Sequence, residues 1–383
     1  MPDRSPFLLD PDVVFLNHGS FGAVPAPVFE TYQALQREME LQPVRWLQRE
    51  AEDRLAVARA HLARYVGSDA DDLVYVPNPT TAVNMVVKSL QLGHGDEILT
   101  TDHEYGAMDR TWRWVSGRTG AVYRRVHIPL GVTADEFVDR VWRERTDRTR
   151  VLFLSHLTSA TAMRFPVEEL VRRGRDAGLL TIVDGAHVPG HLPLDLRALD
   201  CDVYTGANHK WLCAPKGSAF VAVRREVQPM LEPLVVSWGW ESDHPSDSTF
   251  VDHHEWQGTR DLSAFLATPA AIDWTVAQDW PAVQARCHDL LADACRRVDE
   301  LTGLAPVYAD DGFPWTAQLA VVRLPDVDPV EFKRRLYEEH RVEAPVHRFR
   351  DEVLLRISIA PYNVPDDVDA LLAALRHLLE DPR

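Results

Sequence analysis

Short β-rich runs alternate with helical segments through the middle of the chain, and this alternation is the feature that most constrains its fold. The helical segments carry apolar residues every three to four positions, which is the periodicity of an amphipathic helix. Seven runs have the apolar, β-branched composition of strands: residues 73–77, 96–101, 121–128, 151–157, 179–187, 202–206 and 218–224. Strands that alternate with helices pair mainly in parallel, and the helices cover both faces of the sheet. We therefore expect a large α/β domain built on a mainly parallel sheet.

Helical patterns also flank this alternating region. Residues 28–67 have a helical pattern with one break at Pro43, because proline lacks the amide hydrogen that a helix interior needs. A long helical stretch follows Asp261. After it come two strands and two helices, expected at residues 316–324, 353–360, 328–340 and 366–379. This region predicts a second, smaller unit of mixed helix and strand.

The length of the chain agrees with this division. Its 383 residues, 45% of them hydrophobic, are enough for a large domain and a smaller one, each with its own core. We expect residues 18–262 to form the large domain. The smaller α+β domain is expected to combine the N-terminal segment, residues 1–17, with residues 263–383.

Charge and cysteine content limit the kinds of partner and the cellular location that we expect. With 58 acidic and 41 basic residues the formal charge is −17, which disfavours nucleic acid and anionic membrane surfaces. We find no secretory leader and no apolar run of membrane-spanning length. The four cysteines lack CxxC spacing and are too few for a disulfide framework, so a cytoplasmic location is expected.

Lysine is rare, which makes a functional lysine easier to find. The chain has four: Lys88, Lys210, Lys216 and Lys333. Lys88 and Lys333 lie in amphipathic helices, where a solvated side chain is the ordinary role. Lys210 comes just after the strand expected at residues 202–206, at the edge where open α/β sheets place catalytic groups.

Asp184 has a matching position at the end of another expected strand. That strand is apolar throughout, so it is expected to be buried on both faces, and a buried carboxylate needs a partner. A protonated pyridine nitrogen, as in pyridoxal phosphate (PLP), is such a partner, and the ion pair keeps the ring able to accept electrons. An ordinary helix N-cap is the alternative role for Asp184, but it leaves the nearby Lys210 unexplained.

A phosphate site is predicted at the turn after residues 73–77. Asn78 and Pro79 form the turn, and Thr80 and Thr81 open a helix whose free amides and dipole suit a dianion. An ordinary N-cap is the alternative for Thr80. A stacking partner for the ring is sought just beyond the strand at residues 96–101, where His103 is our first choice and Tyr105 the competitor.

A metal site is not expected. His187 and His191 are four residues apart, but Pro189 and Gly190 between them argue against a shared helical face. His253 and His254 are adjacent, so their side chains diverge.

Several motifs occur together in one order along the chain: FLNHGSFGAVPAPV, PNPTTA, DHEYGA, SHLTSATAMRFPVEEL, VDGAH, NHKWLCAPKG, VSWGW, EWQGTRD and RISIAPYN. In this order the chain resembles the fold-type I PLP enzymes of the class V aminotransferase group, and within it the isopenicillin N epimerase-like branch. The resemblance runs nearly end to end. It implies an enzyme whose large domain, residues 18–262, binds PLP.

The resemblance also implies roles for individual residues. Lys210 would carry the cofactor as a Schiff base, with Asp184 at the pyridine nitrogen, and the two are expected to be catalytic together with His103. Further cofactor contacts are expected from Asn78, Thr80, Thr81, Ser159, His187, Asn208 and His209. Thr259 resembles the residue that reaches the phosphate of the other subunit, which implies a homodimer with shared active sites.

Substrate contacts are implied in the same way. Arg356 resembles the arginine that binds the α-carboxylate of the amino-acid substrate, a task for which its two-pronged guanidinium is suited. The segments that the family brings to the pocket supply Asn17, His18, Ser20, Arg164, Trp238 and Trp240.

Two departures from related enzymes bear on the reaction. Ser159 stands where related desulfurases usually carry asparagine. Residues 345–353, where cysteine desulfurases place their nucleophile loop, contain no cysteine, and a persulfide mechanism needs a thiolate. Desulfurase activity is therefore disfavoured.

The remaining reactions all begin with loss of a proton from Cα. We favour a C–S β-lyase that acts on a cysteine S-conjugate in secondary metabolism, because elimination needs one base and Lys210 provides it. An epimerase like that of isopenicillin N is the alternative, and it needs a second proton donor, for which His103 and Tyr105 stay open. Transamination, other side-chain remodelling and a non-catalytic binding module are further alternatives. A dehydrogenase is disfavoured because no GxGxxG follows a strand.

Overall fold

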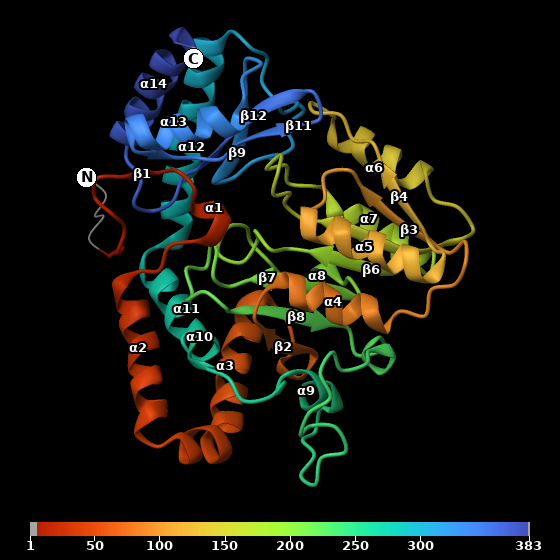
Figure 1. Ribbon diagram of the computed structural model, residues 1–383. Coiled ribbons are helices and arrows are strands. Elements are labelled where there is room, and N and C mark those ends of the chain that lie inside the picture. Colours follow the sequence, from red (N-terminus) through yellow and green to blue (C-terminus); the bar gives the residue numbers. More distant parts are fainter. Residues whose placement is uncertain (1–5, 382–383) are drawn as a thin grey trace.

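The computed structural model describes residues 6–381, and its centre is a sheet of seven strands (Figure 1). In sheet order these are β2 (Leu73–Val76), β8 (Ala219–Val223), β7 (Val203–Ala207), β6 (Leu180–Asp184), β5 (Thr149–Ser155), β3 (Glu97–Thr101) and β4 (Val122–Val126). Each of the seven expected strands is present, and the predicted mainly parallel α/β domain is confirmed.

One strand, β8, runs antiparallel to both of its neighbours. The reason is the short connection from β7, which ends at Ala207, to β8, which begins at Ala219. Such a link returns the chain on the same edge of the sheet, whereas a parallel neighbour needs a crossover helix. The link carries Lys210, so the reversal keeps this lysine at the carboxyl edge of the parallel strands.

Helices cover both faces of the sheet, because successive side chains of each strand point to opposite faces and apolar side chains lie on both. In β2, Val74 and Val76 pack with the helices α4 (Pro79–Ser89) and α5 (Gly106–Thr119). Leu73 and Tyr75 point to the other face and pack with α3. The helices on that face are α3 (Ala51–Val66), α6 (Ala134–Arg143), α7 (Val167–Asp176) and the single turn α8 (Leu196–Leu199).

The N-terminal helical region divides where proline was expected to break it. It consists of α2 (Ala26–Leu41), a π-helical turn (Arg45–Glu50) and α3. The long stretch after Asp261 divides too, into α10 (Ser263–Leu266), α11 (Thr268–Ala277) and α12 (Trp280–Thr302). Both α10 and α11 pack on α2 and α3, beside the large domain, so in this packing the chain leaves the large domain at α12 (Figure 1).

The small domain is a three-stranded antiparallel sheet covered by helices. Its strands, in order, are β11 (Val346–Phe349), β12 (Glu352–Ser358) and β9 (Leu319–Leu324). The helices α12, α13 (Pro329–His340) and α14 (Pro365–Glu380) enclose a core with this sheet. A separate pair joins β1 (Val14–Phe15) to β10 (Val342–Glu343), so the N-terminal segment lies with the C-terminal domain (Figure 1).

The short helix α1 (His18–Phe21) lies between the two domains, and Gly22 ends it. Gly22 has a φ of +71°, and a Cβ at this position would lie 2.1 Å from the carbonyl oxygen of His209. Only glycine permits so close an approach. This contact places the N-terminal segment against the backbone that carries Lys210.

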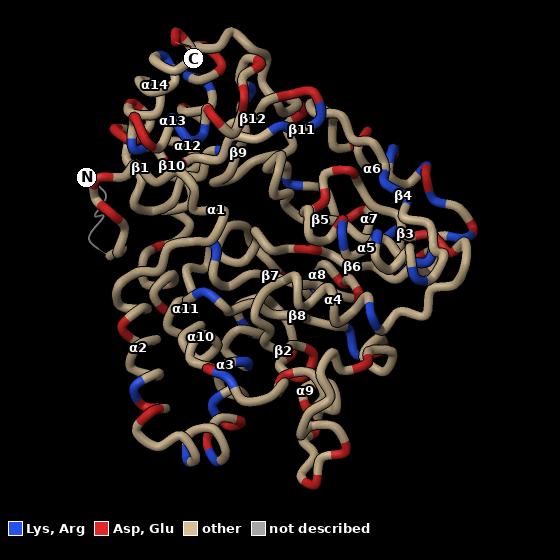
Figure 2. The backbone as a smooth tube through the Cα atoms, in the orientation of Figure 1, with Lys and Arg blue, Asp and Glu red and all other residues tan. Residues whose placement is uncertain are grey.

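Charged residues of both signs are interspersed over the outer helices and loops (Figure 2). Within residues 6–381, no helix combines the length and the apolar composition that a membrane crossing requires.

Candidate active site

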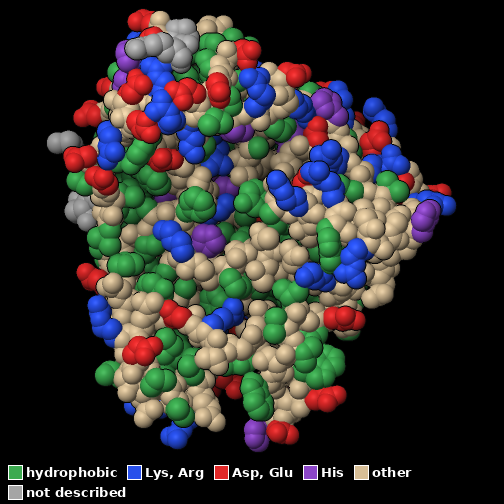
Figure 3. Space-filling view, viewed as in Figure 1, with side chains coloured by type: hydrophobic (Ala, Val, Ile, Leu, Met, Phe, Trp, Pro, Cys, Tyr) green, Lys and Arg blue, Asp and Glu red, His purple; other side chains and the backbone are tan. Residues whose placement is uncertain are grey.

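Three strand ends form the floor of a small cavity at the carboxyl edge of the sheet. Ser155 ends β5 and pairs in register with Asp184, which ends β6, and Lys210 follows β7 by three residues. All three side chains line the cavity, whose volume is about 130 Å³. Near the centre of the face in Figure 3, basic and histidine side chains gather between the small domain and the large one. The sequence prediction that strand ends would bring Lys210 and Asp184 together is consistent with this arrangement.

Lys210 is held by its neighbours as a weak base. Its Nζ lies 3.1 Å from Nε2 of His187. Burial, and after it the positive charge of Arg356, lower the pKa of Lys210 to about 8, against the opposing effect of the Asp184 carboxylate. A lysine with this pKa is about half neutral near pH 8, and the neutral form is the one that acts as a nucleophile or general base.

Asp184 is 4% exposed and accepts a hydrogen bond of 3.0 Å at Oδ1 from the amide of Ala186. Burial raises the pKa of this carboxyl above its ordinary value, while the amide of Ala186 and the charge of Lys210 act in the opposite direction. The ionised carboxylate therefore lacks full compensation here, and a cationic ring nitrogen would stabilise it.

The start of α4 reaches the same cavity. Asn78 caps the helix by accepting hydrogen bonds from the amide of Thr81, at 2.8 Å, and from its hydroxyl, at 3.1 Å. Asn78, Pro79 and Thr80 line the cavity, whereas Thr81 does not. The positive end of the helix dipole and the Thr80 hydroxyl together suit a phosphate group, and Thr81 supports the turn.

The loop after β7 contributes His209, which lines the cavity and whose Nδ1 lies 2.8 Å from the carbonyl oxygen of Ser218. Burial lowers the pKa of His209 to about 4, so it is a neutral hydrogen-bond partner. Asn208 does not line the cavity. It is fully buried, donates to Ser218 Oγ at 3.1 Å, and its Oδ1 has no hydrogen-bond partner among the described residues.

Arg356 comes from β12 of the small domain and lies behind the cavity wall. It donates to the carbonyl oxygen of Ser159 at 2.8 Å and to Oγ of Ser20 at 2.6 Å, and both residues line the cavity. It also donates to Oδ1 of Asn17 at 3.3 Å. Burial lowers the pKa of this guanidinium to about 10. Asn17 itself does not line the cavity but supports Ser20 and Arg356.

The expected stacking residue, His103, is not brought to the cavity. Its two ring nitrogens lie 2.7 Å from Oγ1 of Thr161 and 2.8 Å from the carbonyl oxygen of Ile128, and its ring packs against Phe349. Tyr105, the competitor, lines the cavity and is 49% exposed. This placement is at odds with a stacking role for His103, because Thr161 and Ile128 hold its ring nitrogens and its side chain does not line the cavity.

Four further expected site residues lie away from the cavity. His18 is buried behind Lys210, where its Nε2 lies 3.1 Å from the Lys210 carbonyl oxygen. Arg164 lies over the ring of Phe313. Trp238 and Thr259 are exposed, and neither lines this cavity. An exposed position agrees with the interface role implied for Thr259, which stays a prediction.

Some lining residues were missed by sequence reasoning. Ser155 ends an apolar strand as Asp184 does, and that shared position could have identified it. Its hydroxyl donates to Glu104 at 2.6 Å, and burial raises the pKa of that carboxyl to about 7. Phe21 and Met108 also line the cavity, and neither had a recognisable pattern.

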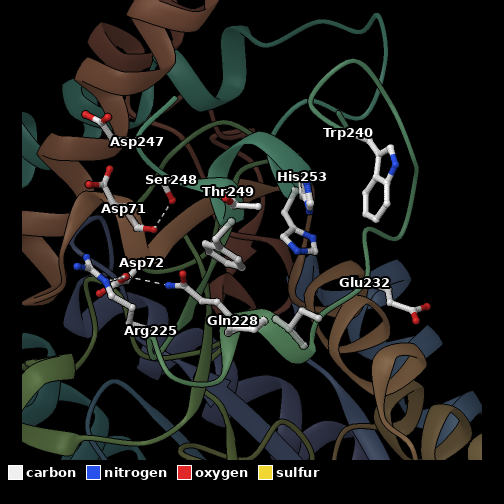
Figure 4. A pocket seen from close by; sticks show the side chains of 14 residues that line it. Asp71, Asp72, Arg225, Gln228, Glu232, Trp240, Asp247, Ser248, Thr249 and His253 are labelled. Atoms are coloured by element: carbon white, nitrogen blue, oxygen red, sulfur yellow. Dashed lines mark hydrogen bonds and ion pairs between the residues drawn. The ribbon is translucent and has the colours of Figure 1, made fainter. Parts of the chain in front are cut away.

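A larger cavity of about 650 Å³ lies at the opposite edge of the sheet (Figure 4). Asp71 and Asp72 come just before β2, and Arg225 comes just after the antiparallel β8, so this is the amino edge of the parallel strands. Trp240, which was expected at the substrate pocket, lines this cavity instead. Open α/β sheets bind ligands at the carboxyl edge, so the smaller cavity is the candidate active site.

The groups around the smaller cavity fit PLP. The buried carboxylate of Asp184 suits the pyridinium nitrogen. The weakly basic Lys210, after the next strand, suits the aldehyde, with which it can form a Schiff base. The capped start of α4 suits the phosphate. The fold and these groups define a PLP-dependent enzyme of fold type I. Residues 14–371 match the family model described as aminotransferase class-V, and the chain belongs to this family.

Known proteins resemble the chain over nearly its whole length. The isopenicillin N epimerase of Amycolatopsis lactamdurans is 37% identical over 391 residues, which cover 98% of this chain and 97% of that protein. A probable chloroplastic L-cysteine desulfhydrase of Arabidopsis thaliana is 27% identical, with 97% and 84% covered. The solved structure of the cystine C–S lyase C-DES with its product cysteine persulfide has a TM-score of 0.82 at 21% identity, with 95% and 97% covered, which shows the shared fold.

Proposed function

We propose that this protein is an amino-acid epimerase that removes the Cα proton of an α-amino acid with Lys210 and returns a proton from Tyr105. The observation that carries the proposal is that both side chains line one cavity. Lys210 follows β7 and Tyr105 follows β3, and the strands between them, β6 and β5, end in Asp184 and Ser155. The two groups therefore enter the cavity from opposite sides of its floor.

Inversion at Cα needs two proton-transfer groups, one on each face of the reacting carbon. From the sequence we favoured elimination, because no second group could be chosen. Tyr105 lies in the cavity and His103 lies outside it, which favours Tyr105 as the second proton-transfer group. Bound PLP supplies the electron-accepting ring, and Asp184 keeps the ring nitrogen protonated.

Arg356 is the group that we assign to the substrate α-carboxylate. It is 6% exposed, and in residues 6–381 no carboxylate lies within ion-pair distance of it. Its Nε is buried and has no hydrogen-bond partner in this part of the chain. A buried guanidinium surrounded only by neutral acceptors is poorly compensated, and a carboxylate ligand would supply the missing charge.

The similarity to the isopenicillin N epimerase supports the proposal, since it extends over nearly the full length of both chains. A C–S β-lyase that acts on a cysteine S-conjugate is the second candidate. It is favoured by the similarity to the desulfhydrase of Arabidopsis thaliana and by the fold shared with C-DES. None of the four cysteines lines the cavity, which agrees with either reaction and disfavours a persulfide mechanism.

The two reactions separate in one experiment. Purified protein with PLP is incubated in deuterated water with a panel of L- and D-amino acids and cysteine S-conjugates. An epimerase exchanges the α-hydrogen, inverts the centre and leaves the side chain intact. Release of a thiol or sulfenate fragment with pyruvate and ammonia, without inversion of the best substrate, would replace the epimerase proposal by the lyase.

The role of Tyr105 has a sharper test. In the Tyr105→Phe variant, Lys210 should still exchange the α-hydrogen with retention, whereas inversion should slow by about a hundredfold or more. Tyr123→Phe is the matched control, because the Tyr123 hydroxyl is buried without a partner among the described residues. Inversion by Tyr105→Phe at the rate of this control would remove Tyr105 from the mechanism.

We also propose a cytoplasmic homodimer with shared active sites, supported by the exposed position of Thr259. Mixing Thr259→Ala and Lys210→Ala subunits tests the sharing. If Thr259 serves the partner's phosphate, one site of each mixed dimer regains both intact groups and activity returns. A monomer at working concentration with full activity would contradict the proposal.

A further inference from the structure

Trp211 directly follows Lys210 and turns its indole into the protein interior, where it is 2% exposed. Its Nε1 lies 3.3 Å from Nδ1 of His187. An indole nitrogen can only donate a hydrogen bond, so Nδ1 must be the acceptor. Burial and the surrounding cations lower the pKa of His187 well below its ordinary value, so the ring is neutral and carries its single proton on Nε2.

That proton points at the catalytic lysine, because Nε2 of His187 lies 3.1 Å from Nζ of Lys210. A protonated amine has no lone pair with which to accept a hydrogen bond, whereas a neutral amine does. The tautomer dictated by Trp211 therefore favours neutral Lys210. The other tautomer would accept from the ammonium and favour the charged form.

The indole is itself held in place. His191 stacks on it with 4.0 Å between the ring centroids and 21° between the planes. His191 accepts from the amide of Gln318 at 2.7 Å, so its proton lies on Nδ1, which donates to the carbonyl oxygen of His187 at 2.9 Å. At Gly190, with a φ of +79°, a Cβ would lie 2.5 Å from the Trp211 backbone. Neither ring can turn without losing these contacts.

We infer that Trp211 is a positioning residue that fixes the tautomer of His187 and thereby makes His187 a hydrogen-bond donor to Lys210. The inference holds for epimerisation and elimination alike, because in both a neutral Lys210 would remove the Cα proton. When PLP is bound, the same Nε2–H remains available as a donor to an acceptor atom beside the lysine.

Other charged or titratable groups also face this pair. Lys210 is influenced by Arg356 and Asp184, and His187 by Arg356, His191 and His209. Arg356, Asp184 and His209 act on the pair through their charge and are retained in a Trp211→Phe variant, whereas His191 also stacks on the indole. Only the Trp211 N–H selects between the two nitrogens of His187.

The test uses the protein without PLP, so it does not depend on the reaction. Nitrogen-15 spectra of histidine-labelled protein should show His187 as the neutral Nε2–H tautomer, with the resonance assigned from its loss in His187→Gln. In Trp211→Phe this preference should disappear. The pKa of Lys210, read from the pH dependence of its acylation by mass spectrometry, should rise by about one unit.

Trp112→Phe is the matched control. Trp112 is fully buried, and its indole nitrogen has no hydrogen-bond partner among the described residues, so this variant removes an indole N–H without changing His187. A Lys210 pKa that moves equally in both variants would overturn the inference. An Nδ1-protonated His187 in the unmodified protein would also overturn it, even if Trp211→Phe failed to fold.

Discussion

Two arginines are buried to nearly the same extent, Arg59 at 8% exposure and Arg356 at 6%, but their surroundings differ. Arg59, on α3, donates to Glu255 at 2.5 Å and to the carbonyl oxygen of Ala70 at 3.0 Å. Among residues 6–381, Arg356 contacts only neutral oxygens. A buried charge that has its counter-ion in the chain stabilises the fold, whereas one that lacks it is suited to bind a ligand of opposite charge.

The difference extends to the regions around them. At the carboxyl edge of the sheet, Lys210 and Arg356 are both cations whose pKa burial lowers, and Asp184 is a carboxyl whose pKa burial raises. These shifts all report charges that the protein alone compensates poorly. Buried charges that are poorly compensated lower the stability of the fold, and they are typical of sites where the same charges serve binding or catalysis.

The largest effect is expected when Lys210 is removed. Lys210→Ala should reduce turnover by about a hundredfold to ten-thousandfold or more, because a positioned general base supplies that much, and the cofactor's yellow colour should disappear from the purified protein. Lys216→Ala, six residues further along, is the control and should keep both. A borohydride-reducible link to another lysine in Lys210→Ala would show that the site is wrongly assigned.

Breaking the Arg59 pair should come next. Arg59→Met leaves Glu255 buried without its cation, which should lower the free energy of unfolding by about 3–5 kcal/mol with little change in turnover per folded molecule. The double variant Arg59→Met/Glu255→Leu should recover most of this loss in denaturant titrations. A single variant as stable as the original protein would show that the pair contributes nothing.

The same variant has a pH dependence whose sign can be worked out. Burial already raises the pKa of Glu255, and loss of Arg59 should raise it further. The folded state then binds more protons than the unfolded state between the unfolded pKa near 4.5 and the raised folded value. The stability deficit of Arg59→Met should therefore shrink as the pH falls through this window, and a deficit that grew would contradict the assignment.

Arg356→Ala should affect substrate binding more than folding. Loss of a charge-assisted contact to a carboxylate should weaken the substrate by about 1.5–3 kcal/mol, or roughly ten- to 150-fold, with PLP affinity nearly unchanged. The free energy of unfolding should fall less than in Arg59→Met, since hydrogen bonds to neutral oxygens are lost but no ion pair among the described residues is broken. Arg356→Lys keeps the charge but loses the two-pronged geometry and should fall between. Equal losses of PLP and substrate would overturn the role.

The smallest effect is expected at the amino-edge cavity of Figure 4. His253→Ala removes a lining residue whose ring packs against that of Trp240, with 4.7 Å between the ring centroids. If the chemistry belongs to the carboxyl edge, turnover and stability should change by no more than about 0.5 kcal/mol. A large loss of activity would make the larger cavity functional and reverse our choice between the two.

The α/β fold and the positions of Lys210 and Asp184 could be predicted from the sequence alone. Strand alternation, helix periodicity and the polar residue at a strand end are local patterns, carried by covalent neighbours. Parallel strands bring their carboxyl ends to one edge whatever the details of packing. For this reason the seven strands and the two residues could be placed without knowledge of any side-chain contact.

Residues that are close in sequence but differently placed could be told apart only from their packing in the folded protein. His103 and Tyr105 follow the same strand two residues apart, and the choice depends on Ile128 and Thr161, which come from distant segments and hold His103. Arg356 and Arg59 look alike in the sequence, because nothing local records whether a carboxylate packs beside them. Contacts between segments that are far apart in the sequence depend on how whole helices and strands pack. Local sequence patterns therefore do not reveal them.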